Sequence, residues 1–272
     1  MRASYPSIPK LRQLSEIAVR IVRESRSLIG HTESREIKYR RKPDGSFVTD
    51  IDLEIEDLIR TRLRSAFPEH GIVGEERQDT ISESGYQWII DPIDGTDSFR
   101  HGIPLYGTLL ALRYDREPLI GIISLPALNR IYVAASGLGA YRNGKLLTLE
   151  DVEPCAIEDE IIAVGERRGF LKCGHSLTFD NLMQINSSVR TYSDCFGHAL
   201  AVEGCVGAMV DYNLCIWDVA ATEVLIREVG GLLVRTNTDE TTDNYETRYN
   251  VVFGKPKVVK WILNQIGVEI KK

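Results

Sequence analysis

Hydrophobic side chains return at helical spacing in two stretches near the start of the chain. Between residues 11 and 22 they recur every three or four positions, and Gly30 then interrupts the pattern. A polar stretch with a Pro-Asp-Gly turn separates this run from a second one, over residues 53–67, which Pro68 ends. The pattern predicts two amphipathic helices with these apolar positions: Leu11, Leu14, Ala18, Ile21 and Val22 in the first, and Leu53, Ile55, Leu58, Ile59, Leu63 and Phe67 in the second.

The middle of the chain changes to the pattern of β-strands. The segments GIVGEE and YQWIIDP are short apolar runs that finish in acids. Between residues 107 and 144, turn residues such as DREP and an Asn-Gly pair separate four further runs, TLLALRY, LIGIISLP, RIYVAA and GAYRNGK. This spacing predicts an antiparallel meander.

Beyond about residue 150 the pattern becomes an alternation of strands and helices. Runs such as IIAVG, AMVDY and VVFGKP alternate with helical segments such as DVAATEVLIREVGG, which is typical of an α/β unit. A length of 272 residues fits two domains. The acidic segment LEDVEPCAIEDE is the expected boundary, so we predict an α+β domain over residues 1–150 and an α/β domain over residues 151–272.

Composition and charge narrow the classes of protein. Hydrophobic residues make up 43% of the chain and charged residues 26%, which suits a packed globular protein and excludes a disordered tail. The 39 acids exceed the 33 Lys and Arg residues by six. This excess argues against nucleic-acid binding, because affinity for a phosphate backbone comes from Lys and Arg. It is compatible with a carboxylate-lined site for divalent cations.

Cysteines and long apolar runs indicate the compartment. The chain has no CxxC pair and no cysteine-histidine zinc pattern, and its odd number of cysteines predicts buried free thiols in a reducing compartment. No signal-peptide core and no run of 18 apolar residues is present, so a cytoplasmic protein without a membrane span is expected. The cysteines stand at positions 155, 173, 195, 205 and 215.

The segment DPIDGTDSF, directly after WII, is the strongest chemical signal. Because proline disfavours a helical residue before it, Asp91 is expected in extended chain at the C-terminal end of a strand. Asp94 then turns the chain toward a short helix, so that both acids face one point with the Ile93 carbonyl between them. Mg²⁺ prefers such oxygen ligands. Two amides at the start of that helix suit a phosphate oxygen, those of Gly95 and Thr96.

Turn formation is the alternative interpretation of these residues, because Asp-Pro and Asp-Gly are common turn pairs. One such dipeptide alone would favour a turn, but the complete string is rare enough by chance to favour a functional site. Further acids are ambiguous singly. Glu75 follows an apolar strand and fits surface charge as well as a metal ligand. Asp218 opens a helix and Asp52 precedes one, and both positions also suit helix caps.

Taken together, these segments resemble the inositol monophosphatase-like family of metal-dependent, lithium-sensitive phosphatases. The resemblance runs from VTDID through GEE and DPIDGTDSF to WDVAA and EVGG, in the family's order and over nearly the whole chain. It implies an α/β fold with an α+β N-terminal half, built as the layered α-β-α-β-α sandwich of the inositol monophosphatase and fructose-1,6-bisphosphatase type. A homodimer is also expected from the resemblance.

The resemblance also implies the roles of individual residues. Glu75, Asp91 and the carbonyl of Ile93 would hold a first Mg²⁺, and Asp91 would share a second with Asp94 and Asp218. Asp52 would assist a weaker third site near Glu75, which gives two to three Mg²⁺ ions. The catalytic set would be Thr96, Asp52 and Glu75, with Thr96, hydrogen-bonded to Asp52, orienting or deprotonating the attacking water. The Gly95 and Thr96 amides would bind the phosphate.

The chemistry of phosphate esters agrees with this assignment. An anionic monoester resists anionic nucleophiles, whereas metal ions neutralise it, lower the pKa of a bound water and stabilise the leaving alkoxide. Direct in-line attack by water needs no nucleophilic Ser, Cys or His, and the five histidines form no obvious triad pattern. His198 is expected to be structural or at the surface rather than in the pocket.

Within the family, two stretches look most like the histidinol-phosphate phosphatase branch. They contain GIPLYGTLLAL and SDCFGHALAVEGCVGAMVD. Asp194 stands where inositol monophosphatases carry small uncharged residues, and Asp211 where they carry Glu. Two acids beside the leaving group favour the ammonium of histidinol, so both are predicted substrate-binding residues. The alternatives are that Asp194 caps a helix near Gly197 and that Asp211 ends a strand facing water.

The function predicted from the sequence is hydrolysis of histidinol phosphate to histidinol, a step of histidine biosynthesis. Trp217, typical of inositol-type members, and Asp97, where the branch often has Lys or Arg, depart from the branch pattern. The same chemistry could therefore act on inositol phosphate, fructose bisphosphate or a 3′-phosphoadenosine nucleotide. A non-catalytic metal-binding regulatory protein ranks lower, because every predicted ligand and Thr96 are present. The expected partner is a small phosphorylated metabolite, with no nucleic acid and no membrane.

Overall fold

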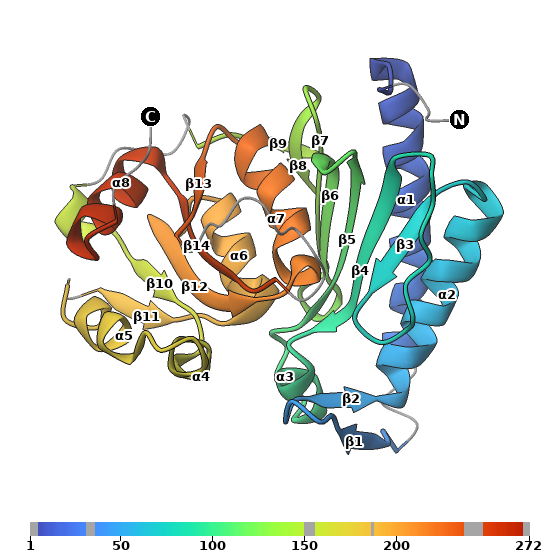
Figure 1. The fold of residues 1–272 in the computed structure, drawn as a ribbon. Coiled ribbons are helices and arrows are strands. Elements are labelled where there is room, and N and C mark those ends of the chain that lie inside the picture. Colours follow the sequence, from blue (N-terminus) through green and yellow to red (C-terminus); the bar gives the residue numbers. More distant parts are fainter. Residues whose placement is uncertain (1–4, 31–35, 150–155, 186–187, 237–246, 269–272) are drawn as a thin grey trace.

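The chain folds into five alternating layers of helices and sheets, shown in Figure 1. The computed structural model describes residues 5–30, 36–149, 156–185, 188–236 and 247–268. One outer layer holds α1 (Ile8–Gly30) and α2 (Asp50–Ala66). The central layer holds α6 (Asp194–Val202) and α7 (Ile216–Glu228), and the other outer layer holds α4 (Arg167–Lys172), α5 (Ser176–Leu182) and α8 (Pro256–Gln265). The predicted α-β-α-β-α arrangement is confirmed.

A seven-stranded sheet separates α1 and α2 from the central helices. Its strands lie side by side in chain order, and only the first pair is parallel. The predicted meander is therefore present. The strands are β3 (Gly71–Gly74), β4 (Tyr86–Asp94), β5 (Gly107–Tyr114), β6 (Glu117–Leu125), β7 (Arg130–Ala135), β8 (Gly139–Arg142) and β9 (Lys145–Leu147), with a short 3₁₀ helix at Pro126–Leu128.

A five-stranded sheet forms the fourth layer. It is mixed, in the order β11-β10-β12-β14-β13, because β12 and β13 both run antiparallel to β14 while β10 is parallel to its two neighbours. Its strands are β10 (Ile162–Val164), β11 (Val189–Thr191), β12 (Ala208–Leu214), β13 (Leu232–Arg235) and β14 (Tyr249–Gly254), preceded by a 3₁₀ helix at Ile157–Asp159. The predicted boundary between residues 150 and 151 lies outside the described residues.

Three hydrophobic cores fill the spaces between the layers. Strand β5 shows how one sheet serves two of them, because its side chains alternate between faces. Leu110 and Leu112 pack with α1 and α2, whereas Leu109 and Ala111 pack with α6 and α7. The third core lies between the five-stranded sheet and the outer helices, around Phe170. The central helices α6 and α7 are thus enclosed by both sheets.

The start of α2 differs from the prediction. The apolar pattern suggested a helix over residues 53–67, but α2 begins at Asp50, because Thr49 caps it. The Thr49 hydroxyl accepts the Asp52 backbone N–H, while the Asp52 carboxylate accepts the Thr49 N–H at 2.8 Å, a capping box. The capping role considered for Asp52 is therefore real. A hairpin of β1 (Tyr39–Arg41) and β2 (Phe47–Thr49) precedes this cap.

Two expectations about thiols and membranes can be compared with the structure. The four described cysteines are free, and Cys195 is buried, but Cys205 is exposed, so the prediction of buried thiols fails there. Cys155 lies outside the described residues. Among the helices that the structure describes, none combines the length and the apolar character needed to cross a membrane.

Candidate active site

A pocket of about 410 Å³ opens between the two sheets, at the ends of elements from both halves of the chain. The turn of the β1–β2 hairpin lines one part of it, and the start of α3 (Thr96–Arg100) lines another. The N-terminal ends of α6 and α7 complete it from the second half. Acids dominate the lining, which includes Glu75, Asp94, Asp97, Glu166, Asp194, Asp211 and Asp218.

The end of β4 places two of these acids. Pairing with β5 is regular as far as Asp91 and resumes at Asp94, with an irregularity between them. Asp91 is extended as predicted, although the strand ends at Asp94 rather than at Asp91. Gly95 then has φ +85°, a conformation that favours glycine, and turns the chain into α3. Asp91 is almost fully buried, and its Oδ1 atom has no hydrogen-bond partner among the described residues.

Backbone amides of the second half hold two carboxylates of the site. The N–H of Cys195, in the first turn of α6, donates to Asp94 Oδ2 at 2.6 Å. The N–H of Cys215, the N-cap of α7, donates to Asp218 Oδ2 at 2.6 Å. Asp218 is the third residue of α7, so it closes a capping box rather than being the N-cap itself. Each bond fixes one oxygen of its carboxylate and thereby orients the other.

Three carboxylates meet closely enough to share a cation. One oxygen each of Asp91, Asp94 and Asp218 lies within 4.8 Å of the others. Burial, and then the charges of neighbouring acids, raise the pKa of Asp91 and Asp94 well above the ordinary range and that of Asp218 to about 7. A divalent cation would relieve this repulsion, and oxygen donors suit Mg²⁺. The residues present therefore fit the metal, and the unpartnered oxygen of Asp91 supports that fit.

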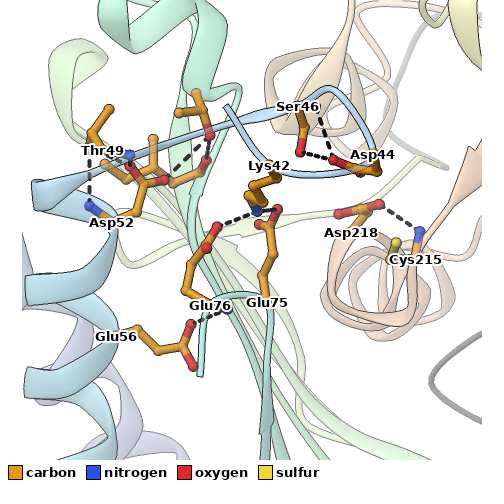
Figure 2. A network of polar contacts seen from close by, with 12 residues as sticks. Lys42, Asp44, Ser46, Thr49, Asp52, Glu56, Glu75, Glu76, Cys215 and Asp218 are labelled. Carbon is orange, nitrogen blue, oxygen red and sulfur yellow. Dashed lines mark hydrogen bonds and ion pairs between the residues drawn. The ribbon is translucent and has the colours of Figure 1, made fainter. Parts of the chain in front are cut away.

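Glu75 does not belong to this triple in the part of the chain that the structure describes. It follows β3, and its carboxylate accepts Lys42 Nζ at 2.6 Å. Figure 2 shows Lys42 reaching from the hairpin to both Glu75 and Glu76. Burial opposes the charged form of Lys42, but the two carboxylates outweigh it and raise the pKa of Lys42. Burial and the charge of Glu75 raise the pKa of Glu76 to about 7.

Thr96 lies between Asp52 and the carbonyl of Ile93. Its hydroxyl is 3.0 Å from the Ile93 oxygen and 3.4 Å from Asp52 Oδ1, and it can donate its single proton to either. Burial raises the pKa of Asp52 to about 6, with a smaller contribution from the charge of Glu75. The structure thus brings Asp52 to Thr96 as the resemblance implies, while the same carboxylate also caps α2.

Asp194 and Asp211 both line the pocket, and neither alternative interpretation describes them. Ser193, not Asp194, is the N-cap of α6, and Asp194 is the first residue of that helix, with φ +58°. Asp211 lies inside β12 and is buried rather than facing water, because it packs against Gly165, where a Cβ would collide with its carboxylate. Burial and then the charges of Glu166 and Asp211 raise the pKa of Asp194 to about 8.

His198 combines both interpretations of the sequence. It is buried and structural, yet it also lines the pocket. Its Nδ1 lies 2.7 Å from the Thr222 hydroxyl and its Nε2 lies 3.4 Å from Asp211 Oδ2. The ring therefore lies between Thr222 and Asp211 and helps to hold the Asp211 carboxylate in place.

Sequence reasoning missed several residues of the pocket. Beside the pocket, Lys42 contacts Glu75 and Glu76. Lys42 precedes a Pro-Asp-Gly segment that the sequence indicates only as a turn, and Glu76 is the second acid of GEE. Glu166 follows β10, and Arg168 of α4 lies 3.5 Å from the Asp44 carbonyl of the hairpin turn. A charged residue directly after a predicted strand is the signal that could have indicated Glu166.

Comparisons with known proteins show which family the chain resembles. A model of the inositol monophosphatase family matches residues 10–266. The chain is 36% identical over 197 residues to a histidinol-phosphatase of Chlorobaculum parvum, covering 72% of this chain and 75% of that protein. It is 31% identical over 258 residues to an inositol monophosphatase of Dictyostelium discoideum, covering 92% and 93%. The extragenic suppressor protein suhB from Bartonella henselae superimposes with a TM-score of 0.83 at 24% identity, covering 95% of this chain and 100% of that chain.

Two packed sheets with a carboxylate-lined pocket at their junction define a class of layered α/β phosphatases. Within that class, the chain belongs to the inositol monophosphatase family.

Proposed function

We propose that this protein is a Mg²⁺-dependent phosphatase that hydrolyses histidinol phosphate to histidinol. The observation that carries the choice of substrate is the acidic wall of the pocket beyond the carboxylate triple, made by Asp194, Asp211 and Glu166. Burial first, and then the negative charges of Glu166 and Asp211, raise the pKa of Asp194. A cationic leaving group such as histidinol relieves the repulsion between these charges, whereas a neutral polyol supplies only hydroxyl groups.

The residues of the chain have distinct tasks in this reaction. Asp91, Asp94 and Asp218 would hold one Mg²⁺, and Glu75 with Asp91 and the Ile93 carbonyl would hold another. Bound Mg²⁺ supplies neutralisation of the phosphate and a lower pKa for water. The Thr96 hydroxyl, held between Asp52 and Ile93, accepts a hydrogen bond from the attacking water and orients it toward phosphorus.

Asp194 and Asp211 would bind the ammonium group of histidinol. Asp211 is oriented by the imidazole of His198 and by the backbone N–H of Tyr212, which donates to its Oδ1 at 2.9 Å. Asp194 lies closer to the reacting phosphate, because its Oδ2 is next to Gly95. A substrate whose phosphate meets Gly95 and Thr96 would extend its leaving group past Asp194 toward Asp211.

Steady-state kinetics with two substrates test the proposal. We expect kcat/KM in Mg²⁺ to be at least about tenfold higher for histidinol phosphate than for myo-inositol 1-phosphate. Asp194→Asn and Asp211→Asn should each lower kcat/KM for histidinol phosphate by about tenfold or more and affect the inositol ester less. Asp180→Asn removes a half-exposed acid of α5 that pairs with Arg167 of α4, and as the matched control it should change neither value. A clear preference of the unmodified protein for the inositol ester would contradict the proposed substrate.

Inositol phosphate is the second candidate. Its support is the Dictyostelium relative named inositol monophosphatase, which aligns over 92% of this chain, and Trp217 beside Asp218. Carboxylates also accept hydrogen bonds from hydroxyl groups, so the acidic wall is compatible with a polyol. In that case Asp211→Asn should lower kcat/KM for the inositol ester at least as much as for histidinol phosphate.

A further inference from the structure

Glu56 is a fully buried acid that none of the roles above uses. It lies on α2 four residues after Asp52, so both side chains leave the same face of the helix. Its carboxylate points to the turn that carries Glu75, as Figure 2 shows. There Oε2 accepts the Glu76 backbone N–H at 2.8 Å, and Oε1 accepts the Arg77 backbone N–H at 3.2 Å.

Arg60 makes further hydrogen bonds to this turn and to Glu56. It is one helical turn beyond Glu56, and its Nε donates to Glu56 Oε1 at 2.7 Å, which pairs the buried charge. Its Nη2 donates to the Arg77 carbonyl at 3.1 Å. The pair therefore holds the N–H of Arg77 through the acid and the C=O of the same residue through the base.

The end of β3 is shaped to admit this pair. A Cβ atom on Gly74 would collide with the Glu56 carboxylate and would come within 2.8 Å of Arg60 Nη2. The carboxylate consequently lies directly against the backbone from which Glu75 projects. Glu75 itself is anchored on the other side, where its N–H donates to the Ile90 carbonyl of β4 at 3.2 Å. The backbone on either side of the Glu75 side chain is thus fixed.

We propose that Glu56 and Arg60 are positioning residues for the Mg²⁺ site, which act by fixing the backbone turn that presents Glu75. This rests on the proposed function, in which Glu75 is a metal ligand. Partners of this kind commonly set metal affinity by 10- to 100-fold without touching the metal. Loss of the hydrogen bonds from Glu56 and Arg60 should let the turn at Glu76 and Arg77 move and weaken Mg²⁺ binding. High concentrations of Mg²⁺ should then restore turnover.

Calorimetric titration of the full-length, metal-free protein with MgCl₂ tests the inference. Glu56→Gln exchanges one of two accepting oxygens for an amide, and it should raise the Mg²⁺ dissociation constant about tenfold or more. At saturating Mg²⁺ its kcat should return to within about threefold of the unmodified value. Asp57→Asn is the matched control, because Asp57 neighbours Glu56 and pairs with the exposed side chain of Arg77, not with the turn's backbone. It should leave the dissociation constant within about twofold.

Two further variants separate positioning from charge and from misfolding. Glu56→Asp keeps the negative charge but withdraws it from the turn, so it should weaken Mg²⁺ binding as Glu56→Gln does. Arg60→Lys keeps the ion pair and loses the bond to the Arg77 carbonyl, and it should weaken binding in the same direction even if Glu56→Gln fails to fold. Unchanged Mg²⁺ affinity in the folded variants, or normal affinity in Glu56→Asp alone, would overturn the inference. Absence of Mg²⁺ binding by the unmodified protein would instead overturn the proposed function and, with it, this role.

Discussion

At the scale of single residues, Asp91, Asp94 and Asp218 show how buried acids held close together favour binding of a cation. A buried polar atom without a partner costs about 1–3 kcal/mol, and more when it is charged. Asp91 Oδ1 is in that position among the described residues, with two further acids beside it. Burial raises the pKa of Asp94 first, and the charges of Asp194 and Asp218 raise it further. The metal-free cluster therefore concentrates buried acids whose repulsion a bound cation would relieve.

Asp94→Asn should separate the stability of this cluster from its chemistry. The substitution keeps an acceptor for the Cys195 N–H but removes one negative charge from the cluster. We expect the melting temperature in EDTA to be no lower than that of the unmodified protein, because a buried repulsion is removed. Mg²⁺-dependent phosphate release should fall at least about 100-fold, because a ligand is lost.

Thermal unfolding in EDTA and a phosphate-release assay in Mg²⁺ measure the two effects, with Asp180→Asn as the control. Normal phosphate release by Asp94→Asn would show that Asp94 is not a metal ligand.

At the scale of elements, helix starts and strand ends build the site together. The first turn of α6 supplies the N–H that holds Asp94, although Cys195 lies 101 residues further along the chain. The β1–β2 hairpin supplies Lys42, and Arg100 of α3 stacks on Phe47 of β2 with its guanidinium 3.7 Å from the ring centroid. This cation–π contact ties the hairpin to the helix that begins at Thr96.

The junction between α2 and β3 makes folding stability depend on pH. His70 stacks on Phe67 and Tyr86, and its Nδ1 accepts the Trp88 indole N–H at 3.1 Å. Burial, and then the charge of Lys10, lower the pKa of His70 to about 4 from an ordinary value of 6.5. Because the folded protein binds this proton less readily than the unfolded chain does, the stability is complete above about pH 6.5 and falls as the pH drops toward 4.

His70→Gln keeps an acceptor for Trp88 and cannot be protonated. The free energy of unfolding should therefore fall less steeply between pH 6.5 and pH 4.5 in His70→Gln than in the unmodified protein. His101→Gln, at an exposed position, is the control and should keep the original slope. Denaturant titrations at a series of pH values measure these slopes. Equal slopes in His70→Gln and His101→Gln would contradict the role of His70.

How far the sequence predicts the elements depends on the range of the interactions involved. Hydrophobic spacing predicted α1 and the meander, because each depends on near neighbours along the chain. It misplaced the start of α2, which the Thr49 capping box decides. Caps depend on single hydrogen bonds rather than on periodicity, so an apolar pattern does not register them.

The same distinction applies to the site. The DPIDGT string predicted where Asp91 and Asp94 lie, because both acids belong to one strand end. The burial of Asp211 and the contact of Lys42 with Glu75 were not predictable, because they depend on how distant elements pack. The roles of Glu56 and Glu166 have the same origin. Sequence reasoning therefore finds candidate ligands that are close along the chain and misses the residues that contact them from distant elements.

At the scale of the whole molecule, the two sheets must keep their relative position for the carboxylates to meet. Glu203, directly after α6, is one of the residues that connect the layers. Its largely buried carboxylate accepts the Tyr132 hydroxyl of β7, and it pairs with Arg130 at 3.3 Å and with Arg142 of β8 at 2.5 Å. The central helix layer is thereby joined to the seven-stranded sheet.

Glu203→Gln should destabilise this joint. Removing the charge leaves two arginines without their shared partner, and because both are partly exposed we expect a loss of about 1–3 kcal/mol in the free energy of unfolding. Glu24→Gln, which breaks an ion pair with Arg62 at the surface, is the control and should have no measurable effect. Denaturant titration measures both variants. A Glu203→Gln protein as stable as Glu24→Gln would show that the network does not join the layers.

The most direct test of the account is a crystal structure of the protein soaked with Mn²⁺, whose anomalous scattering reveals each bound ion. The account predicts one peak within coordination distance of Asp91, Asp94 and Asp218, and another within that distance of Glu75 and Asp91. A fully loaded crystal without a peak among these carboxylates, or with its peaks elsewhere on the molecule, would contradict it.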